Sequence, residues 1–202
     1  MQAQTRIVAL GDSTTAGTPG FHSPIEAPPL GRGDETSQYA YWLMKQHPEW
    51  EVLNRGVNGE RTDQIAGRFD RDVLNNAPRA VVIIAGVNDI YQGRSVDHVT
   101  SQLRKMYDRA LRAGVRIVAG SIIPFNTADP EQNERMRVVN AWIRAQATAD
   151  GSVAFVDTRG AVAAAGKPDL LASSPDQLHP SVDGYRRMAA AIAPVLAQVL
   201  KP

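Results

Sequence analysis

Five short apolar runs, each closed by a glycine or a polar residue, restrict the fold of this chain more than any other feature. They are rich in β-branched residues and only a few residues long, so each predicts a buried strand. The five runs cover residues 7–10, 50–53, 80–84, 115–119 and 153–156. Their apolar residues are nearly continuous instead of alternating, which is typical of a parallel sheet covered on both faces.

Helical patterns lie between these strands. The clearest spans residues 96–111, where apolar residues recur every three or four positions between Ser95, a candidate N-cap, and Gly114. Further helical patterns cover residues 182–199, 136–147, 37–46 and 62–74. Strand and helix therefore alternate, which predicts a doubly wound α/β fold with a five-stranded parallel sheet. Ligands of such sheets bind at the carboxyl ends of the strands, so functional residues are expected there.

Two proline-rich stretches, residues 17–34 and 167–180, interrupt this alternation. Their prolines and glycines predict loops. The first stretch directly follows the first predicted strand, and loops of this length in compact domains are commonly functional.

Composition narrows the classes of function. A length of 202 residues predicts a single domain over residues 1–202. The 22 basic and 21 acidic residues are dispersed, so we expect a small-molecule partner and no binding of nucleic acid. The chain has no cysteine, which excludes disulfides, thiolate metal sites and a cysteine nucleophile. No apolar run reaches the length of a membrane span, and we expect a cytoplasmic protein, or a secreted one whose signal peptide has been removed.

The first predicted strand runs directly into Gly11-Asp12-Ser13-Thr14. This places Ser13 at the carboxyl end of a strand, where a serine is a candidate nucleophile. Because serine alone is weakly nucleophilic, it needs a base within hydrogen-bond reach and a third group that orients the base. The alternative interpretation is a structural turn in which Ser13 caps a helix.

A candidate base lies near the other end of the chain, in Asp176-Gln177-Leu178-His179-Pro180. The spacing lets Asp176 accept a hydrogen bond from one imidazole nitrogen of His179 while the other nitrogen faces a nucleophile. A helix-capping aspartate beside a surface histidine would have the same pattern. Ser13, Asp176 and His179 are therefore the candidates for a catalytic triad.

Two further strand ends could stabilise the oxyanion of an acyl-transfer reaction. Gly56, in an Asn-x-Gly-x-x-Gly segment, could bring its backbone N–H close to a substrate because it has no side chain. Asn88, in a Gly-x-Asn-Asp segment, could direct a side-chain N–H at the same oxygen. Each segment could also be an ordinary turn. Together with the backbone N–H of Ser13, these groups form the predicted oxyanion hole.

In their order and position, these four blocks resemble the motifs of the SGNH (GDSL-type) hydrolases. The matching residues are Ser13, Gly56, Asn88 and the pair Asp176 and His179, in that order along the chain. The resemblance extends over residues 7–200. It implies a three-layer, flavodoxin-like fold and the hydrolysis of esters or thioesters by a serine, without a metal or another cofactor. Thr14 stands where many members carry leucine, which concerns the lining of the substrate site more than the mechanism.

The sequence also indicates which residues line the substrate site. The candidates are Asp12 and Thr14 beside the nucleophile, Ile90 and Tyr91 after Asn88, and Phe21 in the first proline-rich stretch. An apolar lining favours esters of small to medium acyl groups, whereas sugar binding calls for exposed aromatic platforms. Aromatic residues make up only 6% of the chain, so the simple ester is preferred and a carbohydrate O-acetyl esterase with the same triad is the alternative.

A binding protein is the alternative from another class. The hydroxyl-rich residues 13–18 follow the first strand of a flavodoxin-like pattern, where they could bind a flavin or a phosphate. The stretch lacks the glycine fingerprints of nucleotide-binding loops and leaves Asp176 and His179 unexplained. A serine hydrolase is therefore the leading hypothesis.

Overall fold

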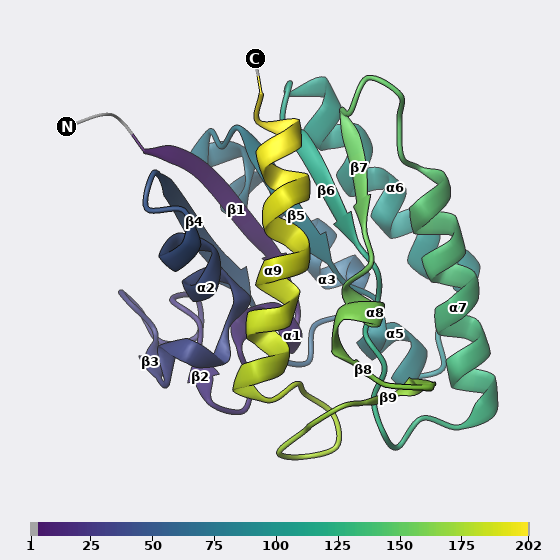
Figure 1. Ribbon diagram of the computed structural model, residues 1–202. Helices are drawn as coiled ribbons and strands as arrows, with labels where there is room; N and C mark the ends of the chain where they lie inside the picture. Colours follow the sequence, from purple (N-terminus) through teal and green to yellow (C-terminus); the bar gives the residue numbers. More distant parts are fainter. Residues whose placement is uncertain (1–3, 202) are drawn as a thin grey trace.

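A parallel sheet forms the centre of the computed structural model, which describes residues 4–201 (Figure 1). Its strands are β1 (Thr5–Gly11), β4 (Trp50–Gly56), β5 (Ala80–Ile84), β6 (Arg116–Gly120) and β7 (Val153–Val156). They lie in the order β4-β1-β5-β6-β7, and every neighbouring pair is parallel. This is the flavodoxin-like order, in which the chain starts near the middle of the sheet and moves outward in both directions. The predicted five-stranded parallel sheet is confirmed.

Helices cover both faces of the sheet and complete three layers (Figure 1). One face carries α2 (Tyr39–Gln46) and α9 (Val182–Val199). The other carries α3 (Thr62–Gly67), α6 (Val96–Arg112) and α7 (Pro130–Ala145). Shorter helices, α1 (Ser13–Ala16), α4 (Phe69–Asp72), α5 (Val87–Tyr91) and α8 (Thr158–Val162), lie between the longer elements.

The side chains of β1 alternate between two hydrophobic clusters. Val8 and Leu10 belong to the cluster on the side of α6 and α7, and Ile7 and Ala9 belong to the one on the side of α2 and α9. All four are completely buried. Both faces of the strand are therefore removed from water, which explains the continuous apolar run in the sequence.

The structure departs from the predicted elements in three segments. The helix predicted over residues 62–74 is divided into α3, α4 and a 3-10 turn (Leu74–Asn76), because the backbone leaves the helical conformation at Arg68 after Gly67. Helix α7 begins at Pro130, before its apolar stripe, because Asp129 forms a capping box with Gln132. Each proline-rich stretch contributes to a small antiparallel pair: β2 (Phe21–His22) with β3 (Arg32–Gly33), and β8 (Ala163–Ala164) with β9 (Lys167–Leu171).

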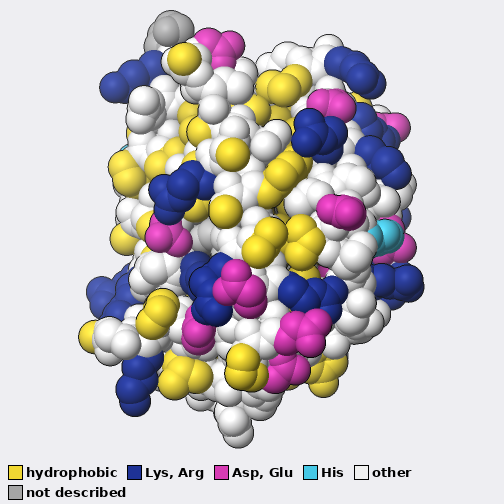
Figure 2. All heavy atoms as spheres, turned by 90° about the vertical axis from the view of Figure 1, so that its right-hand side faces the viewer, with side chains coloured by type: hydrophobic (Ala, Val, Ile, Leu, Met, Phe, Trp, Pro, Cys, Tyr) yellow, Lys and Arg dark blue, Asp and Glu magenta, His cyan; other side chains and the backbone are white. Residues whose placement is uncertain are grey.

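Charges of both signs are interspersed on the face over α7 (Figure 2), in agreement with the dispersed basic residues of the sequence. Among residues 4–201, no helix has the length and apolar character needed to cross a membrane.

Arg68 ties the carboxyl ends of β1 and β4 together. Its guanidinium donates to the backbone oxygens of Gly11 (2.9 Å) and Arg55 (2.8 Å), and it forms ion pairs with Asp72 (2.7 Å) and Glu60 (2.6 Å). The Arg68 side chain is only 7% exposed. A buried cation with four partners fixes these strand ends because each partner would lose a hydrogen bond if the cation moved.

Replacing Arg68 by methionine is therefore expected to lower the free energy of unfolding by about 3 kcal/mol, since Asp72 and two backbone oxygens lose a buried partner. Urea denaturation measures the change. Arg71→Ala is the control, because Arg71 also contacts Asp72 but its side chain is 65% exposed. An equal loss in both variants would contradict the role of Arg68 in joining the ends of β1 and β4.

Candidate active site

Ser13 is the first residue of α1, directly after the end of β1. Asp12 is the N-cap of this helix, and its Oδ1 accepts a hydrogen bond from the Thr14 N–H (3.0 Å). The chain thus turns sharply from strand to helix at Ser13. The backbone N–H of Ser13 has no acceptor among residues 4–201 and is available to a ligand.

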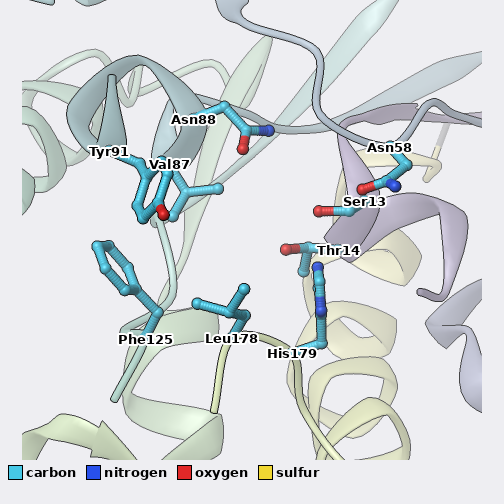
Figure 3. Close-up of a pocket in the computed structure, with 9 residues that line it drawn as sticks. All are labelled: Ser13, Thr14, Asn58, Val87, Asn88, Tyr91, Phe125, Leu178 and His179. Carbon is cyan, nitrogen blue, oxygen red and sulfur yellow. The ribbon is translucent and has the colours of Figure 1, made fainter. Parts of the chain in front are cut away.

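A cavity of about 160 Å³ opens beside Ser13 (Figure 3). Its lining comes from segments far apart in the sequence: Ser13, Thr14, Asn58, Val87, Asn88, Tyr91, Phe125, Leu178 and His179. The triad candidate His179 and the oxyanion candidate Asn88 therefore share one cavity with Ser13. The cavity lies at the carboxyl ends of the strands, as predicted for this class of sheet.

Asp176 and His179 form a hydrogen-bonded pair. The Nδ1 atom of His179 lies 2.7 Å from Asp176 Oδ2, and Asp176 Oδ1 accepts the backbone N–H groups of His179 (2.8 Å) and Leu178 (3.0 Å). Burial would raise the pKa of Asp176, but these hydrogen bonds outweigh it and hold the pKa below its ordinary value. An ionised Asp176 favours a proton on Nδ1, which leaves Nε2 as an acceptor.

The imidazole ring of His179 points toward the end of α1 that carries Ser13 and Thr14 (Figure 3). Among residues 4–201, no hydrogen bond joins Ser13 Oγ to this ring. Catalytic hydrogen bonds are often long without a substrate and tighten in the reacting complex. The structure thus brings the three triad candidates into one region without making the last contact.

The Asn88 amide is held by the neighbouring turn. Its Nδ2 donates one hydrogen to the backbone oxygen of Glu60 (2.9 Å). Because a primary amide has two hydrogens, the second remains available to the cavity. One amide hydrogen of Asn88 is therefore left for the role that the sequence-based hypothesis gives it.

Gly56 has a different role from the one expected. Its N–H donates to Asn54 Oδ1 (2.9 Å), so this hydrogen is already used. A Cβ at Gly56 would lie 2.1 Å from the backbone nitrogen of Ala16, so only glycine lets α1 pack this closely on the end of β4. Gly56 therefore shapes the site through a close approach of two backbones.

Gly59 carries the free N–H of this turn. The other backbone N–H groups of residues 56–60 have acceptors. In addition to the Gly56 bond, Val57 donates to Gly11 O, Asn58 donates to Glu26 Oε1 and Glu60 donates to Val57 O. Among residues 4–201, nothing accepts the Gly59 N–H. Gly59 follows Asn58, which lines the cavity. From the sequence, the first glycine of the Asn-x-Gly-x-x-Gly segment, Gly56, was selected as the donor. The second glycine, Gly59, was the other candidate in this segment.

The five predicted substrate-lining residues divide into two groups. Thr14 and Tyr91 line the cavity. Asp12, Ile90 and Phe21 do not line this cavity, which corrects the prediction that they line the substrate site. Asp12 is buried as a helix cap, Ile90 points from α5 into the core, and Phe21 lines a separate cavity of about 300 Å³.

Four lining residues were missed: Asn58, Val87, Phe125 and Leu178. Phe125 is only 2% exposed and follows a run of buried apolar residues after β6, so its sequence context is that of a core residue. Its ring makes an edge-to-face contact with Tyr91 at a centroid distance of 5.9 Å. Leu178 lies between Asp176 and His179, and this position was the only sequence feature that indicated a lining residue.

The hydroxyl-rich stretch after β1 does not form an open phosphate site. Thr14 and Thr15 are buried in α1, and Thr15 Oγ1 is hydrogen-bonded to the Tyr39 hydroxyl (3.1 Å). The Asp12 carboxylate already caps this helix. These contacts argue against the flavin or phosphate alternative.

Asp63, Asp89 and His98 place three possible metal-ligand atoms within 4.8 Å of one another. Both carboxylates already have donors, however. Asp89 accepts from the N–H and hydroxyl of Thr62 (both 2.8 Å), and Asp63 pairs with the Arg61 guanidinium (3.1 Å). The neighbouring positive charge of Arg61 opposes a bound cation, so these contacts favour a hydrogen-bonded cluster at the start of α3.

The buried Asp12 carboxyl leads to a prediction about how stability depends on pH. Burial raises the pKa of Asp12 to about 7 although its hydrogen bonds with Thr14 oppose the rise. The folded state therefore holds this proton more tightly than the unfolded state, and stability is lost as the pH rises toward 7. Asparagine keeps the cap and removes the charge. We expect the stability advantage of Asp12→Asn over the wild type to grow by about 2 kcal/mol from pH 5 to pH 8.

Urea denaturation at the two pH values measures this difference. The same exchange at Asp34, an exposed residue that caps a 3-10 helix (Glu35–Ser37), is the matched control. A constant difference between Asp12→Asn and the wild type across this range would contradict the predicted ionisation.

Comparisons with known proteins identify the family of this chain. Residues 9–187 match the model of the GDSL-like Lipase/Acylhydrolase family. An acetylxylan esterase from Geobacillus stearothermophilus is 29% identical over 164 residues, which cover 74% of each chain.

Solved structures show the same fold. A GDSL-like lipase from Bacteroides thetaiotaomicron VPI-5482 has a TM-score of 0.75 at 24% identity, covering 97% of this chain and 89% of its own. The acetylxylan esterase Axe2 from Geobacillus stearothermophilus has a TM-score of 0.69 at 23% identity, covering 100% and 98%. With a family match over most of its length, the chain belongs to the GDSL-like lipase/acylhydrolase family and is a carboxylic ester hydrolase.

Proposed function

We propose that this protein hydrolyses esters of short acyl groups through an acyl-enzyme on Ser13. The observation that carries the proposal is the Asp176–His179 pair, joined at 2.7 Å, on the cavity that Ser13 lines. A base oriented by a carboxylate beside a serine at a strand end is the arrangement that serine activation requires.

The reaction proceeds in two halves. Nε2 of His179 accepts the proton of Ser13 as its Oγ attacks the ester carbonyl, and the imidazolium then protonates the departing alcohol. Water, activated by the same nitrogen, attacks the acyl-enzyme and releases the acid. Asp176 keeps the ring oriented and stabilises its positive charge throughout.

The negative oxygen that forms in both halves is held by three N–H donors. They are the backbone N–H of Ser13, the second amide hydrogen of Asn88 and the backbone N–H of Gly59. Each is without an acceptor in the described part of the chain, which supports this choice. Gly59 replaces Gly56 here because the Gly56 N–H is bound to Asn54.

The size of the cavity supports a short acyl group. Its volume of about 160 Å³ is well below the range of about 300–1,000 Å³ usual for sites of drug-sized ligands. Val87, Phe125 and Leu178 give it an apolar wall. An acetyl to butyryl group fits this description, and a long chain would extend into solvent.

The test is an assay of the wild type and Ser13→Ala on p-nitrophenyl esters of increasing chain length. We expect turnover by the wild type to be highest for the short esters and to fall at least about a thousandfold in Ser13→Ala. A chelator in the assay removes adventitious metal. Equal turnover in the two proteins would show that Ser13 is not the nucleophile.

An acetylated carbohydrate is the second candidate substrate. Tyr91 lies at the cavity and its side chain is largely exposed, as an aromatic platform for a sugar ring would be. A curated relative is an acetylxylan esterase, which supports the same candidate. In this arrangement the acetyl group enters the cavity and the sugar stacks on Tyr91.

Tyr91→Ala separates the two candidates. If the substrate is a sugar acetate, we expect the variant to lose about fivefold in kcat/KM on acetylated xylo-oligosaccharides, since the platform is worth about 1 kcal/mol, and to keep its rate on p-nitrophenyl acetate. The comparison uses liberated acetate as the common readout. Equal effects on both substrates would argue against a sugar platform.

A further inference from the structure

We propose that Glu26 is a positioning residue for ester hydrolysis and that it holds the turn of residues 56–60 so that the Gly59 N–H faces the reacting carbonyl. Glu26 lies in the proline-rich stretch of residues 17–34, more than thirty residues from this turn. The inference rests on the proposed function and adds a residue that acts through the oxyanion hole without touching the substrate.

Both carboxylate oxygens of Glu26 are used. Its Oε1 accepts the backbone N–H of Asn58 (2.8 Å), and its Oε2 accepts the backbone N–H of Ser23 (2.9 Å). Ser23 is completely buried, and its hydroxyl donates to the backbone oxygen of Gly56 (2.6 Å). The proline-rich stretch is thus fastened to the turn at two points by residues three positions apart.

The other side of the same turn is fastened to the body of the protein. The backbone oxygen of Glu60 accepts from Asn88, and its carboxylate pairs with the buried Arg68. Glu60 is therefore fixed from α5 and from Arg68, while Asn58 depends on Glu26. Gly59, which carries the free N–H, lies between these two anchored residues.

Gly59 cannot hold its own conformation. Its φ is +77°, and a Cβ placed on it would have nothing within 4 Å, so the space beside its Cα is open. Glycine reaches many backbone conformations at little cost. Without an acceptor for the Asn58 N–H, the peptide units on either side of Asn58 could turn toward water and carry the Gly59 N–H out of line.

Such a change would affect turnover more than substrate binding. An oxyanion donor acts mainly when charge develops on the carbonyl oxygen, so its misplacement lowers kcat and leaves KM nearly unchanged. A purely structural role of Glu26 would lower stability and leave kcat per folded molecule intact. The split between kcat and KM therefore distinguishes positioning from support of the fold.

The experiment compares Glu26→Ala, Glu26→Gln and a matched control, Glu35→Ala, which removes an exposed carboxylate near the end of the same loop region. Kinetics on p-nitrophenyl acetate are measured well below each unfolding midpoint, with active sites counted by a serine-directed phosphonate. We expect kcat to fall about tenfold in Glu26→Ala with KM within about twofold. Glutamine has one acceptor oxygen in place of two, so Glu26→Gln is expected between Glu26→Ala and the wild type.

A second readout does not depend on activity. In amide NMR spectra, the Gly59 resonance is expected to shift or broaden in Glu26→Ala and to remain in place in Glu35→Ala. Should Glu26→Ala unfold at the assay temperature, Glu26→Gln, which keeps the size of the side chain, carries both measurements.

The outcomes separate the two proposals. If the wild type depends on Ser13 but Glu26→Ala matches Glu35→Ala in kcat and in the Gly59 resonance, Glu26 is not a positioning residue. A loss confined to KM would overturn the proposal as well, because it would place Glu26 in substrate binding. If the wild type and Ser13→Ala are equally active, it is the proposed function that fails, and the positioning role fails with it.

Discussion

The site depends on the close contact between α1 and the end of β4, because this contact decides where Ser13 lies. Gly56 allows the contact, since a Cβ there would overlap the Ala16 backbone. Asn54 then joins the two elements. Its Nδ2 donates to Ala16 O (3.1 Å) and to Gln38 Oε1 (2.7 Å), while its Oδ1 accepts the Gly56 N–H (2.9 Å). One buried, fully bonded amide thus links β4, α1 and the segment before α2, and the direction of α1 follows from it.

Two aspartates near Ser13 show how local surroundings decide what a carboxylate can do. Asp12 is completely enclosed, and its pKa is raised to about 7 by burial. Asp176 is partly exposed, and its hydrogen bonds with the His179 ring and with the backbone N–H groups of Leu178 and His179 hold its pKa below the ordinary value. Only Asp176 is therefore reliably ionised near neutral pH and suited to stabilise an imidazolium. Asp12 serves the site differently, through the cap that begins α1 at Ser13.

The sequence predicted those parts that depend on local pattern. The strands could be located because burial on both faces makes them continuously apolar, and Ser13, Asp176 and His179 because they follow strand ends or a tight turn. The free N–H of Gly59 was missed because the choice between the two glycines depends on the Asn54 side chain, which no pattern in that segment reveals. Ile90 was wrongly assigned because α5 is a single short helix, in which neighbouring residues point to the cavity and to the core.

The sheet fixes one side of the site, and loops supply the other side. The Ser13 turn and the turn of residues 56–60 are fixed by the ends of β1 and β4, which any chain with this sheet order must bring together. The cavity wall comes instead from Tyr91 of α5, Phe125 after β6 and Leu178 before α9. These three lie outside the sheet, and two of them are substantially exposed. Substitutions at Tyr91 and Phe125 are expected to change what fits the cavity while Ser13 keeps its place after β1, so one fold can accommodate different substrates.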